Sequence, residues 1–150
     1  MNTPAKPMVI LMADDDADDR LLAKDALLEC QLAGDIHFVE NGEELLDYLH
    51  HRGNYLQAGQ APRPGLILLD LNMPKKDGRE ALREIKNDPE LRKIPVVVLT
   101  TSKAETDIGQ IYELGANSFI SKPVTFDSLV NVMRVLGSYW FSIVELPVKK

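Results

Sequence analysis

The chain has 150 residues, a net charge of −6 and a pI of about 5.0, and 45% of its residues are hydrophobic. Its length and composition are typical of one globular domain. The negative charge argues against non-specific binding to nucleic acid or to anionic membranes, and no apolar run approaches the roughly 20 residues that span a bilayer.

The N-terminal residues and the single cysteine favour a location in the cytoplasm. Residues 1–7 lack the hydrophobic segment of a signal peptide, and Cys30 has no second cysteine with which to form a disulfide. We therefore expect a cytoplasmic protein. We also expect a flexible N-terminus over 1–7, a folded domain over 8–137, and an aromatic tail over 138–150 with no output domain.

Short apolar runs alternate with helical patterns along the chain, which is typical of βα units in a parallel sheet. Three of the runs are continuously apolar, as strands covered on both faces should be. Two weaker runs with polar neighbours, 36–39 and 118–120, are expected at the edges of the sheet. In chain order the predicted strands are 8–12, 36–39, 66–69, 96–99 and 118–120.

Helical stripes lie between these strands. Leu21, Leu28 and Leu32 mark one apolar face of the first helix. The later stripes consist of Leu45, Leu46 and Leu49, then Leu82 and Ile85, then Ile108, Ile111 and Tyr112, and finally Leu129, Val132, Met133 and Leu136. The pattern predicts an α/β fold of type (βα)₅, doubly wound, with right-handed crossovers that place helices on both faces of the sheet.

Carboxylates follow two of the predicted strands. Asp14 and Asp15 come after the first strand, and Asp70 comes after the third. Because the carboxyl ends of parallel strands share one edge of the sheet, these side chains should converge. Carboxylates 4 Å apart repel by ~4 kcal/mol per pair at intermediate dielectric, so we expect a cation among them. Mg²⁺ fits, since it takes one or two carboxylates together with waters and phosphate oxygens.

Each residue at this edge also has a simpler interpretation. Helix capping explains Asp16 but not the two aspartates before it. Asp70 alone could be a turn residue that bonds its own backbone. Thr100 could reflect β propensity, and Lys122 could be a surface lysine. Their common position favours a site, because a hydroxyl and an ammonium group there could bind the oxygens of a phosphorylated carboxylate.

The motifs at the strand ends form a set: Asp14-Asp15, the stretch 68–74, Asp77-Gly78, Thr100 and Lys122-Pro123. This set resembles the CheY-like receiver domain of two-component response regulators over about residues 8–137. The loop before Pro62, the stretch 66–79 and the aromatic tail are more particularly similar to the single-domain regulators of cyanobacterial and bacterial phytochromes. The resemblance implies a flavodoxin-like three-layer sandwich with strand order 2-1-3-4-5.

The resemblance also implies a metal site and a partner. Asp70 would accept a phosphoryl group from the phosphohistidine of a sensor histidine kinase, with a phytochrome as the expected kinase. Asp14, Asp15, Asp70 and the backbone carbonyl of Asn72 would hold Mg²⁺. The protein would then act as a signalling switch that changes partners, and its only catalysis would be its own phosphorylation and dephosphorylation.

The resemblance gives three further residues a role in the switch. Lys122 would pair with the phosphoryl oxygens, and Thr100 would move its hydroxyl onto them. Phe119 occupies the position of the family's rotamer-switch aromatic, although a plain edge-strand phenylalanine explains it equally well. Thr101 departs from the small residue common in the family and would hinder access to the phosphoryl group.

Other functional classes are less well supported. The pattern Asp14-Asp15-Asp16 contains the D-x-D of phosphohydrolases with an aspartate nucleophile, but Asp18 stands where that family has a small hydroxylic or β-branched residue. A later acidic motif is also missing. A docking scaffold would not need the full set of acids, threonine and lysine. The sequence has no glycine-rich phosphate loop, and its three histidines lack the spacing of a zinc site.

The final segment is rich in aromatic residues, with Tyr139, Trp140 and Phe141 in succession. It could fold back over the last helix or form an interface between two copies of the chain. The resemblance to phytochrome regulators favours a homodimer formed through this segment.

Overall fold

The structure is a computed structural model, which describes residues 8–29, 34–57, 61–71, 73, 75–100, 112–113, 115–116, 118–121 and 125–137. Only the backbone of Thr100 and Phe119 is described. Several predictions fall outside the described residues: those on Leu32, Asn72, Thr101, Ile108, Ile111, Lys122, residues 1–7 and the tail 138–150.

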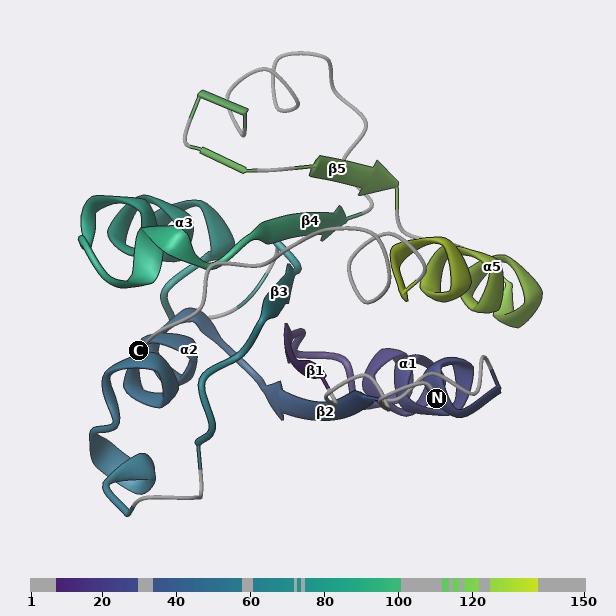
Figure 1. Cartoon of the computed structure of the whole chain (residues 1–150), viewed down its shortest axis with the longest axis horizontal. Helices are drawn as coiled ribbons and strands as arrows, with labels where there is room; N and C mark the ends of the chain where they lie inside the picture. Colours follow the sequence, from purple (N-terminus) through teal and green to yellow (C-terminus); the bar gives the residue numbers. More distant parts are fainter. Residues whose placement is uncertain are drawn as a thin grey trace, which may run out of the picture.

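Five parallel strands form one sheet in the order β2-β1-β3-β4-β5 (Figure 1). Both the parallel architecture and the strand order confirm the prediction. The two weaker apolar runs do form the edge strands β2 and β5. The bounds are β1 Met8–Ala13, β2 Gly34–Val39, β3 Leu66–Leu69, β4 Val96–Thr100 and β5 Ser118–Ser121.

Helices cover both faces of the sheet (Figure 1). The pair α1 and α5 packs together on one face, and α2 and α3 pack together on the other. The bounds are α1 Ala17–Glu29, α2 Gly42–His50, α3 Gly78–Asn87 and α5 Phe126–Gly137, with short 3₁₀ turns at Gly53–Tyr55 and Leu91–Lys93. Asn41 and Asp77 cap α2 and α3, because their side chains accept hydrogen bonds from backbone N–H groups of the first turn.

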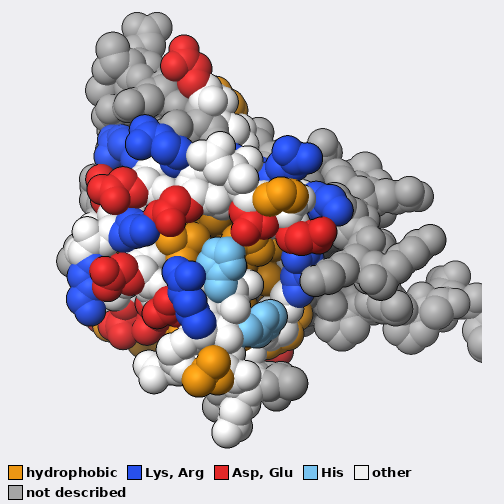
Figure 2. All heavy atoms as spheres, turned by 90° about the vertical axis from the view of Figure 1, so that its left-hand side faces the viewer, with side chains coloured by type: hydrophobic (Ala, Val, Ile, Leu, Met, Phe, Trp, Pro, Cys, Tyr) orange, Lys and Arg blue, Asp and Glu red, His pale blue; other side chains and the backbone are white. Residues whose placement is uncertain are grey.

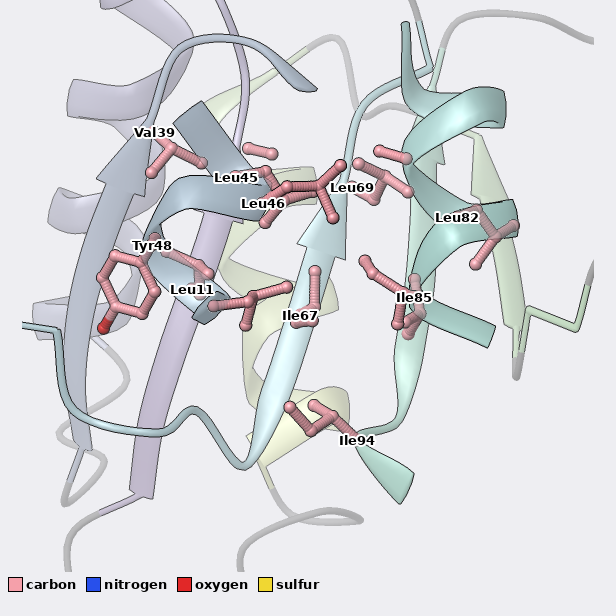
Figure 3. Close-up of a cluster of buried hydrophobic side chains, with 14 of the residues drawn as sticks. Leu11, Val39, Leu45, Leu46, Tyr48, Ile67, Leu69, Leu82, Ile85 and Ile94 are labelled. Atoms are coloured by element: carbon pink, nitrogen blue, oxygen red, sulfur yellow. The ribbon is translucent and has the colours of Figure 1, made fainter. Parts of the chain in front are cut away.

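The strands alternate their side chains between two cores. Leu11, Ile67 and Leu69 face α2 and α3, whose Leu45, Leu46, Leu82 and Ile85 complete the cluster drawn in Figure 3. The intervening residues, including Ile10, Leu66 and Leu68, face α1 and α5. Because both faces are covered, every position of a central strand must be apolar. This explains the continuous apolar runs.

The predicted apolar face of α1 was wrong. Leu21 and Leu28 are 59% and 67% exposed, and the buried side of the helix carries Ala23, Ala26 and Leu27. The small alanines let α1 lie close to α5 and the sheet, so this helix packs through its smallest residues. No helix within the described part of the chain is both long enough and apolar enough to cross a membrane.

Candidate metal centre

The pairing of β1 with β3 brings two of the predicted acids to the same level. Ala13 at the end of β1 lies opposite Leu69 at the end of β3. The next residues are Asp14 and Asp70, and the backbone N–H of Asp70 donates to the carbonyl of Ala13 at 3.0 Å. The register of two neighbouring strands therefore places both aspartates at the carboxyl edge of the sheet.

Asp14, Asp15 and Asp70 converge at this edge. Each offers a carboxylate oxygen, and these three oxygens lie within 4.8 Å of one another. Asp14 is completely buried and Asp70 is 7% exposed, whereas Asp15 is exposed. The cluster thus consists of two buried acids and one exposed acid.

The hydrogen bonds at the start of α1 show that Asp14 and Asp16 have different structural roles. The carboxylate of Asp14 accepts a hydrogen bond from the backbone N–H of Asp16 at 2.9 Å. The carboxylate of Asp16 in turn accepts from the N–H groups of Asp18 and Asp19, at 2.9 and 3.3 Å. Asp16 is therefore a helix cap, as its simpler interpretation held, and is directed to the helix rather than to the cluster.

A tight loop follows Asp70. The carbonyl of Leu71 accepts hydrogen bonds from the N–H groups of Met73 and Gly78, at 3.2 and 3.0 Å. A Cβ on Gly78 would lie 2.6 Å from the carbonyl oxygen of Asp70. Only glycine lets the start of α3 approach the residue after β3 this closely, which explains the Asp77-Gly78 pair in the sequence.

The donor set fits a hard divalent cation. Three carboxylates at this separation repel one another, by ~4 kcal/mol for a pair at 4 Å and an effective dielectric of about 20. A magnesium or manganese ion would relieve that repulsion, since both prefer oxygen ligands. The exposure of Asp15 leaves one side of the cluster accessible from solvent.

The remaining predicted residues are placed only in part. Thr100 is the last residue of β4 and pairs with Ser121, the last residue of β5. The backbone of Thr100 therefore lies at the same edge as the acids, and Lys122 is the next residue of the chain after Ser121. The side chain of Thr100, and all of Asn72 and Lys122, lie outside the described residues.

The sequence did not indicate the contacts that Arg20 and Gly42 make with the loops that carry the acids. Arg20 donates to the carbonyl of Asp14 at 2.8 Å and contacts Glu40 at 3.4 Å, and the N–H of Gly42 donates to Lys76 at 2.9 Å. One sequence pattern does indicate where α2 begins. Asparagine followed three residues later by glutamate, as in Asn41-x-x-Glu44, is close to the capping box that marks a helix start.

A concavity lies at the opposite edge of the sheet. It has a volume of about 330 Å³ and is lined by residues at the end of α2 and by residues that precede β3 and β4, among them His50, His51, Arg63 and Asp88. Figure 2 shows this face, where histidine side chains lie beside a hydrophobic floor among charges of both signs. Hydrogen bonds from the N–H groups of Leu91 and Glu90 hold the pKa of Asp88 below its ordinary value. This hollow is not the carboxylate cluster, which lies at the carboxyl ends of the strands.

Comparison with known proteins identifies the family. Residues 10–134 match the protein family described as "Response regulator receiver domain". The chain is 40% identical to the response regulator Rcp1 of Synechocystis sp. over 94% of both chains. The solved structure of the Mn²⁺-bound form of Rcp1 superposes with a TM-score of 0.85, covering 95% of this chain and 100% of the other.

A second solved structure, the phosphorylated cyanobacterial phytochrome response regulator RcpA, is 41% identical and has a TM-score of 0.86, over 95% of this chain and 99% of the other. These matches confirm the predicted resemblance to phytochrome response regulators. Together with the five-stranded sheet and its acidic edge, they show that the chain belongs to the response regulator receiver domain family.

Proposed function

We propose that this protein is a phosphoacceptor switch in which Asp70 takes a phosphoryl group from a histidine kinase. The observation that supports this most directly is the position of Asp70, nearly buried and within 4.8 Å of the carboxylate oxygens of Asp14 and Asp15. A carboxylate held beside two others needs a cation. A cation beside a carboxylate prepares it to receive a phosphoryl group.

The chemistry requires little covalent work from the protein. A carboxylate oxygen of Asp70 forms the bond to phosphorus as the bond from phosphorus to the imidazole nitrogen of the donor breaks, and the histidine leaves. Asp14, Asp15 and Asp70, with the carbonyl of Asn72, would hold Mg²⁺, which would supply positive charge beside the phosphoryl oxygens. The surrounding protein positions these groups.

Thr100 and Lys122 would respond to the product. The acyl phosphate adds close to two negative charges at the edge where β4 and β5 end. A hydroxyl and an ammonium group there would be drawn to its oxygens, which would shift the loops after these strands. Phe119 on β5 would change its rotamer with this shift and so alter the surface that a partner contacts. The result is a change in the partner that the protein binds.

The similar proteins suggest the partner. RcpA is a phytochrome response regulator, and this chain matches it over almost its whole length. We infer that the kinase is of the phytochrome type, that the two proteins meet in the cytoplasm, and that the segment 138–150 joins two copies of the chain in a homodimer.

Intact-mass spectrometry tests the proposal. The protein is incubated with acetyl phosphate, with Mg²⁺ or with EDTA, and should gain the mass of one phosphoryl group only when Mg²⁺ is present. Asp70→Asn should gain none. Uptake of the same mass by Asp70→Asn contradicts the assignment of the nucleophile, and undiminished uptake in EDTA contradicts the metal requirement.

A phosphohydrolase that uses Asp14 is the competing function. It requires the second aspartate of the D-x-D, Asp16, to act on the substrate, but Asp16 is engaged in capping α1. Turnover of a small phosphate ester that survives Asp70→Asn and is lost in Asp14→Asn would favour this alternative.

A further inference from the structure

The start of α2 touches both loops that carry the acids. We call residues 39–42, which join β2 to α2, the α2 bracket. The carbonyl of Val39 accepts the backbone N–H of Asp14 at 3.0 Å, and the N–H of Gly42 donates to the carbonyl of Lys76 at 2.9 Å. Lys76 lies on the loop that follows Asp70. One short segment is therefore bonded to the β1–α1 loop on one side and to the β3–α3 loop on the other.

The contact at Gly42 has no room for a side chain. A Cβ at this position would lie 2.1 Å from the carbonyl oxygen of Lys76 and 2.8 Å from its carbonyl carbon. These are backbone atoms, so a side chain on Gly42 must push the β3–α3 loop and α2 apart. The same loop passes through a left-handed residue, Lys75, with φ of 62°, which limits how it can adjust.

Arg20 makes the connection on the other side. Its guanidinium donates to the carbonyl of Asp14 at 2.8 Å and reaches the carboxylate of Glu40 at 3.4 Å. The Arg20 side chain is only 19% exposed and its bond to the Asp14 carbonyl is partly buried, whereas its contact with Glu40 is exposed to water. Arg20 thus ties the residue that carries a buried acid to the α2 bracket.

The bracket is itself held rigid. Glu44 on the first turn of α2 accepts the backbone N–H of Glu40 at 2.8 Å through its side chain. Its own N–H donates to the side chain of Asn41 at 2.8 Å. The N–H groups of Glu40, Gly42, Glu44 and Leu45 are therefore paired, which holds the bracket in one conformation.

We propose that Gly42 and Arg20 are positioning residues, which set the spacing between the two acid-bearing loops and thereby the affinity of the acid cluster for a divalent cation. The residues that orient metal ligands in this way alter affinity when they are changed, although they never touch the ion. The inference rests on the proposed function, because the loops they align carry the proposed metal ligands and nucleophile.

Binding of Mn²⁺ alone tests the proposal without reference to activity. The free ion is measured by electron paramagnetic resonance in a titration of the full-length protein. Gly42→Ala should bind Mn²⁺ about tenfold more weakly than the parent. The matched control is Gly53→Ala at the other end of α2, where φ is +61° and a Cβ would meet only the flexible side chain of Asp47 at 3.2 Å. Its affinity should stay within about twofold of the parent, although it too is strained.

Arg20→Gln provides an independent test that does not create a steric clash. If Arg20 acted only through its charge, its removal would strengthen cation binding, because a positive group would have left the neighbourhood of the acids. Positioning predicts the opposite sign, with affinity about tenfold weaker. Arg20→Lys keeps the charge, but a single ammonium group cannot bridge the carbonyl of Asp14 and the carboxylate of Glu40 as the planar guanidinium does. It should therefore not restore the parent affinity.

The outcomes separate this proposal from the proposed function. Parent-like binding of Mn²⁺ by folded Gly42→Ala, or parent-like or tighter binding by Arg20→Gln, overturns the positioning role. Should Gly42→Ala fail to fold, the result with Arg20→Gln decides. A parent protein that binds Mn²⁺ but gains no phosphoryl mass from acetyl phosphate overturns the proposed function, whereas a parent that gains it leaves only the positioning role in question.

Discussion

Tyr48 links three parts of the molecule through one side chain. Its hydroxyl, on α2, donates to the carbonyl of Pro62 at 2.8 Å. Its ring packs against Tyr55 and His37, with ring centroids 5.2 and 6.1 Å apart. Burial, with smaller contributions from the charges of Tyr55 and Asp35, raises the pKa of Tyr48 to about 12. The folded state therefore favours the neutral phenol.

Substitution of Tyr48 by phenylalanine should have two effects on stability. At neutral pH the variant should lose about 1 kcal/mol, the net value of one hydrogen bond. Because the folded pKa lies above the ordinary value of 10, the contribution of the neutral phenol is complete below pH 10 and is lost as pH rises to about 12. Tyr48→Phe should lack this alkaline loss, which urea unfolding across that range measures.

The control for this experiment is Tyr112→Phe, whose parent side chain is exposed. It should keep the alkaline loss, since Tyr48 is unchanged. A Tyr48→Phe variant with the same alkaline loss as the parent would contradict the assignment to this hydroxyl.

At the scale of the element, α1 shows what packing adds to a periodic pattern. Leucines seven residues apart, such as Leu21 and Leu28, share a face of the helix, and the sequence pattern therefore predicts that this face is apolar and buried. The structure buries the alanine face instead, because close packing against α5 and the sheet favours small residues over large ones. The spacing of apolar residues in a sequence shows which residues share a helix face, but it does not show how closely that face packs against a neighbouring helix.

Two adjacent leucines on α1 test this packing. Leu27 is buried and Leu28 is exposed, so they form a matched pair. Leu27→Ala should lower the free energy of unfolding by about 2–5 kcal/mol, because it leaves a cavity beneath the helix. Leu28→Ala should change it by less than about 0.5 kcal/mol. Equal losses in urea unfolding would show that α1 is rotated relative to the described packing.

The other elements followed their sequence signals more closely. The central strands β1, β3 and β4 were predicted because continuous apolar runs belong to strands with two covered faces. The leucines of α2 and the Leu82–Ile85 stripe of α3 are buried, as expected for helices with one apolar face. The contacts of Arg20 and Gly42 could not be predicted, because they depend on the conformation of the loops at the carboxyl edge, which neither the apolar runs nor the expected strand order specifies.

At the scale of the whole molecule, the cation requirement predicts metal-dependent stability. The chain carries a net charge of −6, and its described acid cluster lies at one edge of the sheet. A ligand that binds only the folded state at 100 times its Kd adds about 2.7 kcal/mol. For a chain of this length each kcal/mol raises Tm by about 2–4 °C. We therefore expect Mg²⁺ to raise Tm by several degrees relative to EDTA.

Variants at exposed aspartates show whether this effect belongs to the cluster. Asp15→Asn removes one proposed ligand without disturbing the core and should lose most of the shift in Tm. Asp25→Asn, at an exposed position on α1, should retain it. A shift of the same size in all three proteins would indicate general screening of negative charge instead of a specific site.

The convergence of the acids was predictable because parallel strands end at one edge. The sequence did not indicate that Asp14 would be buried and Asp15 exposed. Their order in the chain is the same in either arrangement, and only the turn into α1 decides which side chain points inward.

The two covered faces of the sheet have a consequence for how β3 finds its alignment. Sliding a strand by one residue usually exposes its apolar side chains to water, and that penalty keeps half-buried strands in place. The side chains of β3 would stay buried after such a slip, because helices cover both faces of the sheet and all four residues are apolar: Leu66, Ile67, Leu68 and Leu69. Backbone hydrogen bonds join both ends of this strand to β1: Gly65 donates to the carbonyl of Val9 at 2.8 Å, and Asp70 donates to the carbonyl of Ala13 at 3.0 Å. One of the backbone hydrogen bonds that hold β3 against β1 is thus made by the same residue that we propose as the nucleophile.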